Sequence, residues 1–554
     1  MNSNKSTNKL KKFIKDEAFW LCILFFFIFL SSKAIFHTGF FRTIDDISTV
    51  RIMYMVKELQ RGNWINNFPI RWSADLAHGF GYPLYLFYAP LVYYAGAILM
   101  IFGKFSHIVA TKWVYAFPLL VGPIFFYLAA RQKMSRLPAT LGACTYALFP
   151  FRGYDTYIRG GVGEAWSMAF LPMIFAGIFL LEKNKRWGGI LFSLFLALAI
   201  LSHNLSGLLI TALIIIYGFI FYRKSADFWK SFFLGLGLSA FFWLPAYYYL
   251  NIVKVSYSNQ NTGQILNFLE PISTFFKVEI PYNPEARFSS LIFYLFILIL
   301  AIFVWQYKKI NKKYQSHFIF WITSGFIFYC ILFQPFAFIW KMTLPITRLI
   351  QFPWRILIVL SFIIPFLLGC TIELIKKNRF MIPLVMILIS LNLFYLPVFK
   401  PREYSFFYEY SAADTGICAT SWGDEYLPVW VKLCAGGEPS KKIDIKNGSV
   451  KLLKSDNMDL LADVNVEKKT DLIVYKYYFP GWQVFVDGKK QPVDYSFSEQ
   501  GNFKTQVMPG HHKVQVIFSK TAIMWMSDFI TIISLIFFIW RFFPNRLSKM
   551  KIFQ

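Results

Sequence analysis

Asp45 and Asp46 stand next to each other a few residues after the first long apolar stretch of the sequence. Adjacent carboxylates at such a boundary contribute little to a stable fold. They are well suited to take a proton from a hydroxyl group or to hold a divalent cation such as Mg²⁺ or Mn²⁺. The sequence therefore predicts a catalytic or metal-binding role for Asp45 and Asp46.

The composition predicts a protein built mostly of membrane helices. Of the 554 residues, 56% are hydrophobic and 16% are charged. Apolar runs long enough to cross a hydrocarbon core of ~30 Å recur along the chain. The formal net charge of +27 does not indicate nucleic-acid binding, because the Lys and Arg residues cluster in short loops between these runs. That distribution is typical of a multi-pass membrane protein, so we expect a lipid bilayer as partner and no nucleic acid.

The basic loops also predict a topology. If all of them face the cytoplasm, an even number of crossings must separate each pair. The run at 84–102, which follows Pro83, contains Pro90 and is rich in Tyr, breaks this parity and is expected not to cross. The result is about twelve crossings with both termini in the cytoplasm. The candidate runs are 18–36, 84–102, 109–130, 137–151, 164–182, 188–203, 206–222, 228–249, 288–307, 317–334, 354–375, 381–397 and 521–541.

With this topology, the polar residues that could bind a substrate gather on the outer side. Guanidinium groups there would suit a phosphate. Four of the candidates have plainer alternatives: a turn and helix start for the Arg159 and Glu164 segment, a helix hairpin for His203, and a side chain that only reaches the interface for Arg355. The candidates for substrate or phosphate binding are Arg71, Asp75, Arg159, Glu164, His203, Arg348 and Arg355, and Arg287 also lies outside.

The first external loop, 37–108, contains a segment with helical periodicity. Residues 48–61 place an apolar stripe, which includes Ile52 and Met55, opposite a polar face that includes Arg51 and Glu58. We expect this helix to lie on the membrane surface and to hold the Asp pair at the headgroup level. Asp46 could alternatively act only as the cap of this helix.

Three domains are expected: a transmembrane module at 1–397, an extracytoplasmic β-rich domain at 398–520, and a final helix with a basic cytoplasmic tail at 521–554. The Asp487-Gly488 pair between apolar alternations predicts a β-hairpin. Cys418 and Cys434 lie in the external segment, where a disulfide can form. Strands are expected at 472–478, 483–486, 491–495, 503–507 and 513–518.

An external membrane site has no nucleotide to draw on, and no nucleotide-binding or hydrolase motif occurs in the sequence. A lipid-phosphate-linked donor fits such a site. A carboxylate would take the proton of an acceptor hydroxyl, and external Arg residues would hold the departing lipid phosphate.

This layout resembles the C-type glycosyltransferase superfamily of polytopic membrane enzymes, which carries an acidic motif in its first external loop followed by amphipathic juxtamembrane segments. A closer resemblance is to YfhO-like bacterial membrane proteins and to membrane proteins labelled as related to pyruvoyl-tetrahydropterin synthase. The synthase itself is soluble and zinc-dependent, and no cluster of its His ligands occurs here. The motifs that carry the closer resemblance are Gly79-Phe80-Gly81-Tyr82-Pro83, Tyr88-Ala89-Pro90, Phe352-Pro353-Trp354-Arg355, Tyr478-Phe479-Pro480-Gly481-Trp482, Val486-Asp487-Gly488-Lys489 and Pro509-Gly510-His511-His512.

The resemblance implies an inverting transfer of a sugar from a polyprenyl-phosphate carrier to a cell-envelope glycan, lipid or protein. The reaction would take place on the outer face of a bacterial or archaeal cytoplasmic membrane, with Asp45 or Asp46 as base or metal ligand.

Two other functions stay open. A transporter or flippase of lipid-linked glycans would need polar residues along a central path, and the apolar runs are nearly free of them. A non-catalytic surface assembly protein would use the β domain as its working part.

Overall fold

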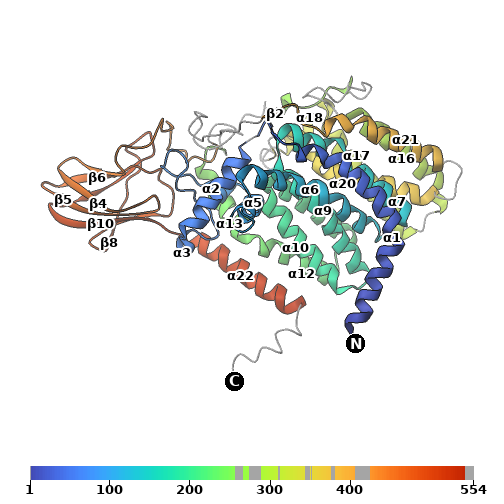
Figure 1. Cartoon of the computed structure of the whole chain (residues 1–554), viewed down its shortest axis with the longest axis horizontal. Coiled ribbons are helices and arrows are strands. Elements are labelled where there is room, and N and C mark those ends of the chain that lie inside the picture. Colours follow the sequence, from blue (N-terminus) through green and yellow to red (C-terminus); the bar gives the residue numbers. More distant parts are fainter. Residues whose placement is uncertain are drawn as a thin grey trace.

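The computed structural model of the chain describes residues 2–45, 47–255, 266–273, 289–309, 312–343, 350, 352–375, 381–405 and 425–542. The helices form one body, and most of the strands form a smaller domain at one end of it (Figure 1). The helices are α1 (Asn2–Ser32), α2 (Ser48–Arg61), α3 (Trp64–Asn67), α4 (Leu84–Phe87), α5 (Leu91–Ile101), α6 (His107–Ala130), α7 (Arg136–Ala147), α8 (Pro150–Gly153), α9 (Val162–Glu182), α10 (Arg186–Ser202), α11 (Asn204–Phe221), α12 (Ala226–Leu238), α13 (Ala240–Tyr248), α16 (Ser289–Gln306), α17 (Lys312–Cys330), α18 (Ala337–Met342), α20 (Leu357–Ile375), α21 (Met381–Phe394) and α22 (Ala522–Phe542).

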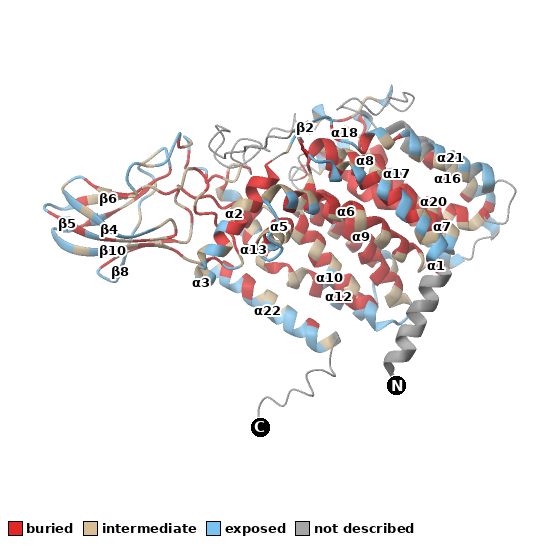
Figure 2. Cartoon of the chain, in the orientation of Figure 1, coloured by how far each residue is buried: buried red, intermediate tan, exposed pale blue. Residues whose placement is uncertain are grey.

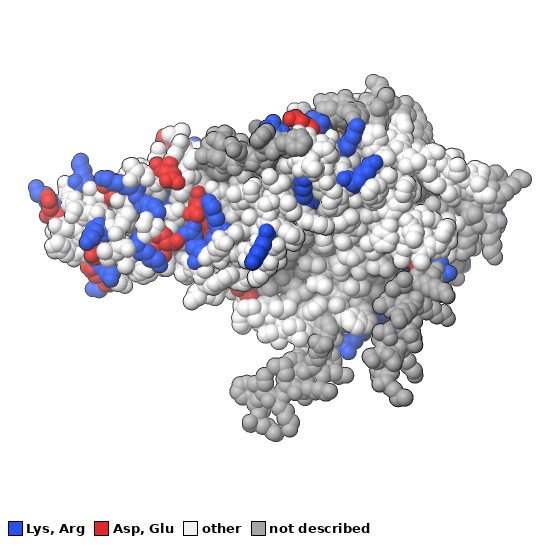
Figure 3. Space-filling model, in the orientation of Figure 1, with Lys and Arg blue, Asp and Glu red and all other residues white. Residues whose placement is uncertain are grey.

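The helical body is that of a multi-pass membrane protein. Within the described ranges, six helices are long and apolar enough to cross a membrane, or seven if the bent pair α12 and α13 forms one span. The expected number of twelve crossings therefore stays a prediction. Helices α9 and α20 lie at the centre, whereas α22 runs along the periphery with most of its surface exposed (Figure 2). Charged side chains gather on the β domain and adjoining loops, and the visible helical surface is mostly free of them (Figure 3).

The loops predicted to be cytoplasmic meet at one end of the helical body. Glu17, near the start of the first apolar run, pairs with Arg131 and Arg136 at 2.9 and 3.0 Å. At the end of α22, Arg541 pairs with Asp227 at 2.7 Å. The start of α1 and the end of α22 lie on the same side of the body in Figure 1. These contacts join the start of the first apolar run to the loop at 131–136, and the loop at 223–230 to the end of α22. The side of the membrane on which these loops lie stays a prediction.

The segment 84–102 is broken as predicted. Its longer helix, α5, has 11 residues, which at 1.5 Å per residue span about half of a bilayer core. Gly96 on α5 allows close approach of Ile52 on α2, since a Cβ at Gly96 would lie 2.6 Å from the Ile52 side chain. The loop thus packs back on itself.

The helix expected at 48–61 forms with those bounds, as α2. Its apolar stripe is buried, with Ile52 and Met55 fully covered. The expectation that its polar face lies open on the membrane surface is wrong, because Arg51 and Glu58 are only 3% and 2% exposed. The loop and the β domain cover this face, so α2 is sandwiched inside the protein.

The β domain has two antiparallel sheets that share one hydrophobic core. The predicted hairpin is confirmed: β7 pairs with β8 across Asp487 and Gly488, which have φ of 50° and 78°. Cys434 is disulfide-bonded, and Cys418, its expected partner, lies outside the described residues. The sheet orders are β4-β5-β10-β7-β8 and β3-β6-β9, with strands β3 (Ile443–Ile445), β4 (Gly448–Asp456), β5 (Asp459–Val466), β6 (Thr470–Val474), β7 (Trp482–Val486), β8 (Lys489–Gln491), β9 (Phe503–Val507) and β10 (Gly510–Phe518).

The β domain is locked onto the first loop by two of the sequence motifs. Trp72 stacks on Phe518 with ring centroids 4.9 Å apart, and Phe80 stacks on Tyr477 at 5.0 Å. The backbone N–H of Tyr477 donates to the carbonyl of Phe80 at 3.0 Å. Gly81, at φ +87°, leaves the space that Trp72 fills. The motif at 79–83 therefore contacts Tyr477, directly before the motif at 478–482, and Trp72 contacts Phe479 and Trp482 within that motif.

Candidate functional site

The segment that carries Asp45 is fixed to the helical body by main-chain hydrogen bonds. The N–H of Ile44 donates to the carbonyl of Ile158 at 2.9 Å, and that of Asp45 donates to the carbonyl of Arg159 at 2.7 Å. Gly160, at φ +83°, makes this contact close, since a Cβ there would lie 3.0 Å from the carbonyl oxygen of Asp45. Gly160 thus allows the backbone after Arg159 to pack closely against the backbone that carries Asp45.

Just before this segment, two short strands tie the first loop to the chain after α21. Strand β1 (Phe40–Phe41) pairs antiparallel with β2 (Tyr404–Ser405). The start of the expected β-rich domain is therefore attached to the helical body, and the compact sheets begin only at β3.

Glu164, at the first turn of α9, is the centre of a buried charge cluster. One of its carboxylate oxygens accepts from Arg159 at 2.6 Å, and the other accepts from Arg355 at 2.9 Å. Nε2 of His203 lies 3.7 Å from Glu164 Oε1. The four residues come from three separate stretches of the chain, and each was a sequence candidate. The structure therefore brings these four candidates into one cluster, and their role in substrate binding stays a prediction.

Asp155 joins this cluster through a 3.0 Å contact with Arg159. Its burial, together with the negative charge of Glu164, holds the pKa of the Asp155 carboxyl well above its usual range. The guanidinium groups of Arg159 and Arg355 therefore lie among carboxyl groups inside the protein, where their charges are little screened by water.

The carboxylate of Asp45 interacts electrostatically with this cluster and with a further cation. Its charge acts on Arg159 and Asp155, and it also acts on Arg51 at the start of α2. Oδ1 of Asp45 is buried and has no hydrogen-bond partner among the described residues. A buried carboxylate oxygen without a partner is costly, so native proteins keep one mainly where it has a chemical use.

Arg71 and Asp75 are not brought into this cluster. Arg71 forms an ion pair with Asp528 on α22 and donates to the carbonyl of Phe241 at 2.8 Å. Asp75 pairs with Arg61 at 2.8 Å and accepts from Asn457 of the β domain at 2.7 Å. Arg71 thus anchors the last helix to the first loop, and Asp75 belongs to the β-domain interface.

Asp46, Arg287 and Arg348 lie outside the described residues. The N-cap position of α2 falls at Ile47, whose side chain makes no capping hydrogen bond. In the part of the chain that the structure describes, no three His, Cys, Asp or Glu side chains are placed to hold a metal ion. A divalent cation therefore stays a prediction that depends on Asp46, and no step is derived through it.

Sequence reasoning missed Arg51 and Asp155. Arg51 was assigned to the solvent face of an amphipathic helix, and the second layer that covers it could not be read from helical periodicity. Asp155 lies four residues before Arg159, a spacing that brings the two side chains together on one turn. That spacing was the signal that could have identified Asp155.

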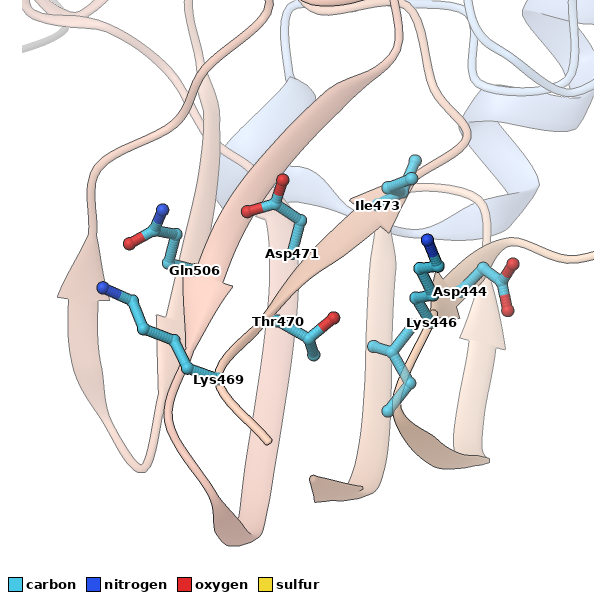
Figure 4. Close-up of a pocket in the computed structure, with 8 residues that line it drawn as sticks. Asp444, Lys446, Lys469, Thr470, Asp471, Ile473 and Gln506 are labelled. Carbon is cyan, nitrogen blue, oxygen red and sulfur yellow. The ribbon is translucent and has the colours of Figure 1, made fainter. Parts of the chain in front are cut away.

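A separate hollow of about 630 Å³ opens on the β domain (Figure 4). Both of its carboxylates, on Asp444 and Asp471, are already paired with lysines at 2.9 and 2.8 Å. Its carboxylates are therefore less available to a ligand than the unpartnered carboxylate oxygen of Asp45. Its lining residues are Asp444, Ile445, Lys446, Lys469, Thr470, Asp471, Ile473 and Gln506.

A family model described as a 6-pyruvoyl-tetrahydropterin synthase related domain, a membrane protein, matches residues 85–399. The matched part contains Arg159, Glu164, His203 and Arg355, and it excludes Asp45 and the β domain. No curated protein matches the chain.

Proposed function

We propose that the chain, which belongs to the 6-pyruvoyl-tetrahydropterin synthase related family of membrane proteins, is a glycosyltransferase. It would move a sugar, with inversion, from a polyprenyl-phosphate carrier to a hydroxyl group of a cell-envelope acceptor. The active site would face the outer side of the cytoplasmic membrane.

The observation that carries this proposal is the Asp45 carboxylate. It is fixed through its own backbone, and its buried Oδ1 has no partner in the described structure. Its negative charge interacts with the guanidinium groups of both Arg51 and Arg159. A carboxylate base beside cations is the combination that removes a proton from a nucleophile and stabilises a phosphate leaving group.

In the proposed reaction, Oδ1 of Asp45 takes the proton of the acceptor hydroxyl. The hydroxyl oxygen forms a bond to the anomeric carbon, and the bond from that carbon to the phosphate oxygen breaks. The electron pair leaves with the lipid phosphate, whose increased negative charge is stabilised by guanidinium groups. Because Arg159 and Arg355 are already bonded to Glu164, their part is to supply a fixed positive field.

The test is Asp45→Asn in protein reconstituted in lipid vesicles and supplied with a panel of polyprenyl-phosphate sugars. Release of polyprenyl phosphate is measured, with Asp463→Asn, on the exposed face of β5, as the matched control. We expect Asp45→Asn to lower the release rate by about 10²–10⁴-fold, which is the usual contribution of a general base. The control should keep the wild-type rate, and thermal unfolding should be similar in both variants.

Wild-type release by Asp45→Asn would refute the role of Asp45. Movement of the intact lipid-linked sugar across the vesicle membrane, without release of polyprenyl phosphate, would instead establish the flippase. The assembly function predicts neither result, and it predicts that activity in cells depends on the β domain alone.

A further inference from the structure

Arg51 is a buried cation whose hydrogen-bonding capacity is only partly used. The residue is 3% exposed. Its Nη1 donates to the hydroxyl of Tyr93 at 3.2 Å, and its guanidinium carbon lies 3.9 Å from the ring centroid of Tyr88. Nε and Nη2 are buried and have no hydrogen-bond partner among the described residues. Two donors of a fixed, planar group are therefore available together.

The other buried arginines near the site are engaged differently. Arg159 and Arg355 bond to Glu164, as described above. Arg152 donates to the carbonyls of Tyr146 and Pro118 at 2.9 and 2.7 Å. Arg51 differs from all three because its two remaining donors meet no acceptor in the described structure. A buried charge in this state is unfavourable until an anion satisfies it.

The unpaired groups of Arg51 and Asp45 are complementary. Their charges act on each other, but Oδ1 of Asp45 and the two free N–H groups of Arg51 are not hydrogen-bonded to one another. The described residues thus hold an acceptor and donors that have no partner and whose charges interact. A ligand with a hydroxyl at one end and a phosphate at the other would satisfy both.

We propose that Arg51, oriented by Tyr88 and Tyr93, forms the subsite for the phosphate group of the lipid-linked donor. The proposal rests on the proposed function for the identity of the donor. The cation–π contact with the Tyr88 ring helps to fix the guanidinium group, whose own planarity places the hydrogens of Nε and Nη2 in one plane. Two phosphate oxygens accept from these donors in a bidentate arrangement.

With this subsite, Asp45 and Arg51 have separate roles in the proposed reaction. Asp45 receives the acceptor's proton, while Arg51 receives the charge that develops on the phosphate as the bond to the anomeric carbon breaks. The field of Arg159 and Arg355 acts on both. Inversion requires the incoming oxygen and the leaving phosphate to lie on opposite faces of the sugar. A base and a phosphate subsite carried by different segments, one before α2 and one on α2, can meet this requirement.

The test is a binding measurement, which does not depend on turnover. Affinities for undecaprenyl phosphate and for uncharged undecaprenol are compared in nanodiscs for the wild type, Arg51→Gln and Arg51→Lys. Arg42→Gln is the matched control, because Arg42 is an exposed arginine of the same loop. The wild type should prefer the phosphate form. Arg51→Gln should weaken undecaprenyl phosphate binding by about 10- to 100-fold and leave undecaprenol binding unchanged, as expected for loss of charged hydrogen bonds.

Arg51→Lys keeps the charge but loses the planar guanidinium group. Its affinity for undecaprenyl phosphate should therefore lie between that of the wild type and that of Arg51→Gln. It also serves as the variant that folds if Arg51→Gln does not. Wild-type phosphate preference in Arg51→Lys and in folded Arg51→Gln would overturn the subsite. A phosphate preference that depends on Arg51 in a protein that transfers no sugar would support the subsite and refute the proposed transferase.

Discussion

Replacing Gly81 by Ala should loosen the β domain from the first loop. A Cβ at this position would lie 2.7 Å from Trp72 Nε1, closer than side-chain atoms pack. Trp72 cannot move aside, because it is 1% exposed and lies against Phe518, Trp482 and Phe479. The backbone adds a second penalty, since φ at Gly81 is +87°.

The two penalties set the magnitude. A left-handed conformation costs an L-residue about 1–2 kcal/mol, and forcing an extra methyl group into a packed interior costs about 1–3 kcal/mol. Their sum is about 2–5 kcal/mol, and it acts on the loop that holds the β domain. Opening of this interface should therefore become about 30- to 5,000-fold more frequent.

Native-state hydrogen exchange measures this opening. The amides to follow are those of Ser73, Tyr82 and Tyr477, which bond to the carbonyls of Tyr82, Ser73 and Phe80 across the loop and the interface. Two glycines of the same domain region serve as controls. Gly488 has φ +78° but open space around it, so Gly488→Ala isolates the backbone penalty of about 1–2 kcal/mol, confined to its hairpin. Gly436 has open space and no such φ, so Gly436→Ala should stay within about 0.5 kcal/mol of the wild type.

The reasoning fails if Gly81→Ala leaves protection at Ser73, Tyr82 and Tyr477 unchanged. It also fails if Gly488→Ala, which does not touch this interface, lowers protection at these amides by as much.

Two further predictions concern charged groups outside the cluster. Burial raises the pKa of Glu58 from 4.5 to about 7, with Arg61 opposing it. Since the folded-state value is the higher one, Glu58 favours folding most below pH 4.5, and this contribution of about 3 kcal/mol is lost as the pH rises through 7. The free energy of unfolding, measured at pH 5 and pH 8, should show this loss in the wild type. An equal loss in Glu58→Gln would contradict the raised pKa of Glu58 as its cause. Arg71→Met should destabilise the protein by about 1.5–3 kcal/mol through lost hydrogen bonds to Asp528 and Phe241. It should leave the affinity for undecaprenyl phosphate unchanged. A fall in that affinity would show that Arg71 contributes to phosphate binding.

Local sequence patterns correctly predicted the helix and the hairpin that are specified by residues close together in the chain. The helix at 48–61 has the predicted bounds because its apolar stripe repeats at helical spacing. The hairpin at Asp487 and Gly488 forms because both residues tolerate the positive φ that the turn requires. Charge parity grouped Arg159, Glu164, His203 and Arg355 on one side of the helices, where the structure places them in contact.

The features that the sequence did not predict depend mostly on contacts between segments that are far apart in the chain. Arg51 and Glu58 looked solvent-exposed because helical periodicity cannot show a second cover over the polar face. Strands β4 and β5 were missed for a different reason. Strand β4 lies at a sheet edge with almost no buried residue, so its sequence lacks the alternation that marks a strand. Arg71 was assigned to phosphate because its partner Asp528 lies near the other end of the chain.

The contact region between the first loop and the β domain has a consequence for how the protein can evolve. The motifs at 79–83 and 478–482 are separated by nearly the whole helical body in the sequence, yet Trp72, which packs against Gly81, also contacts Phe479 and Trp482 of the second motif. A hybrid that takes its β domain from one relative and its first loop from another should assemble poorly, even if each part is sound. Harmful changes at Trp72 should be rescued by second-site changes at Phe518 or Trp482, so the two ends of the chain are expected to evolve as a single unit.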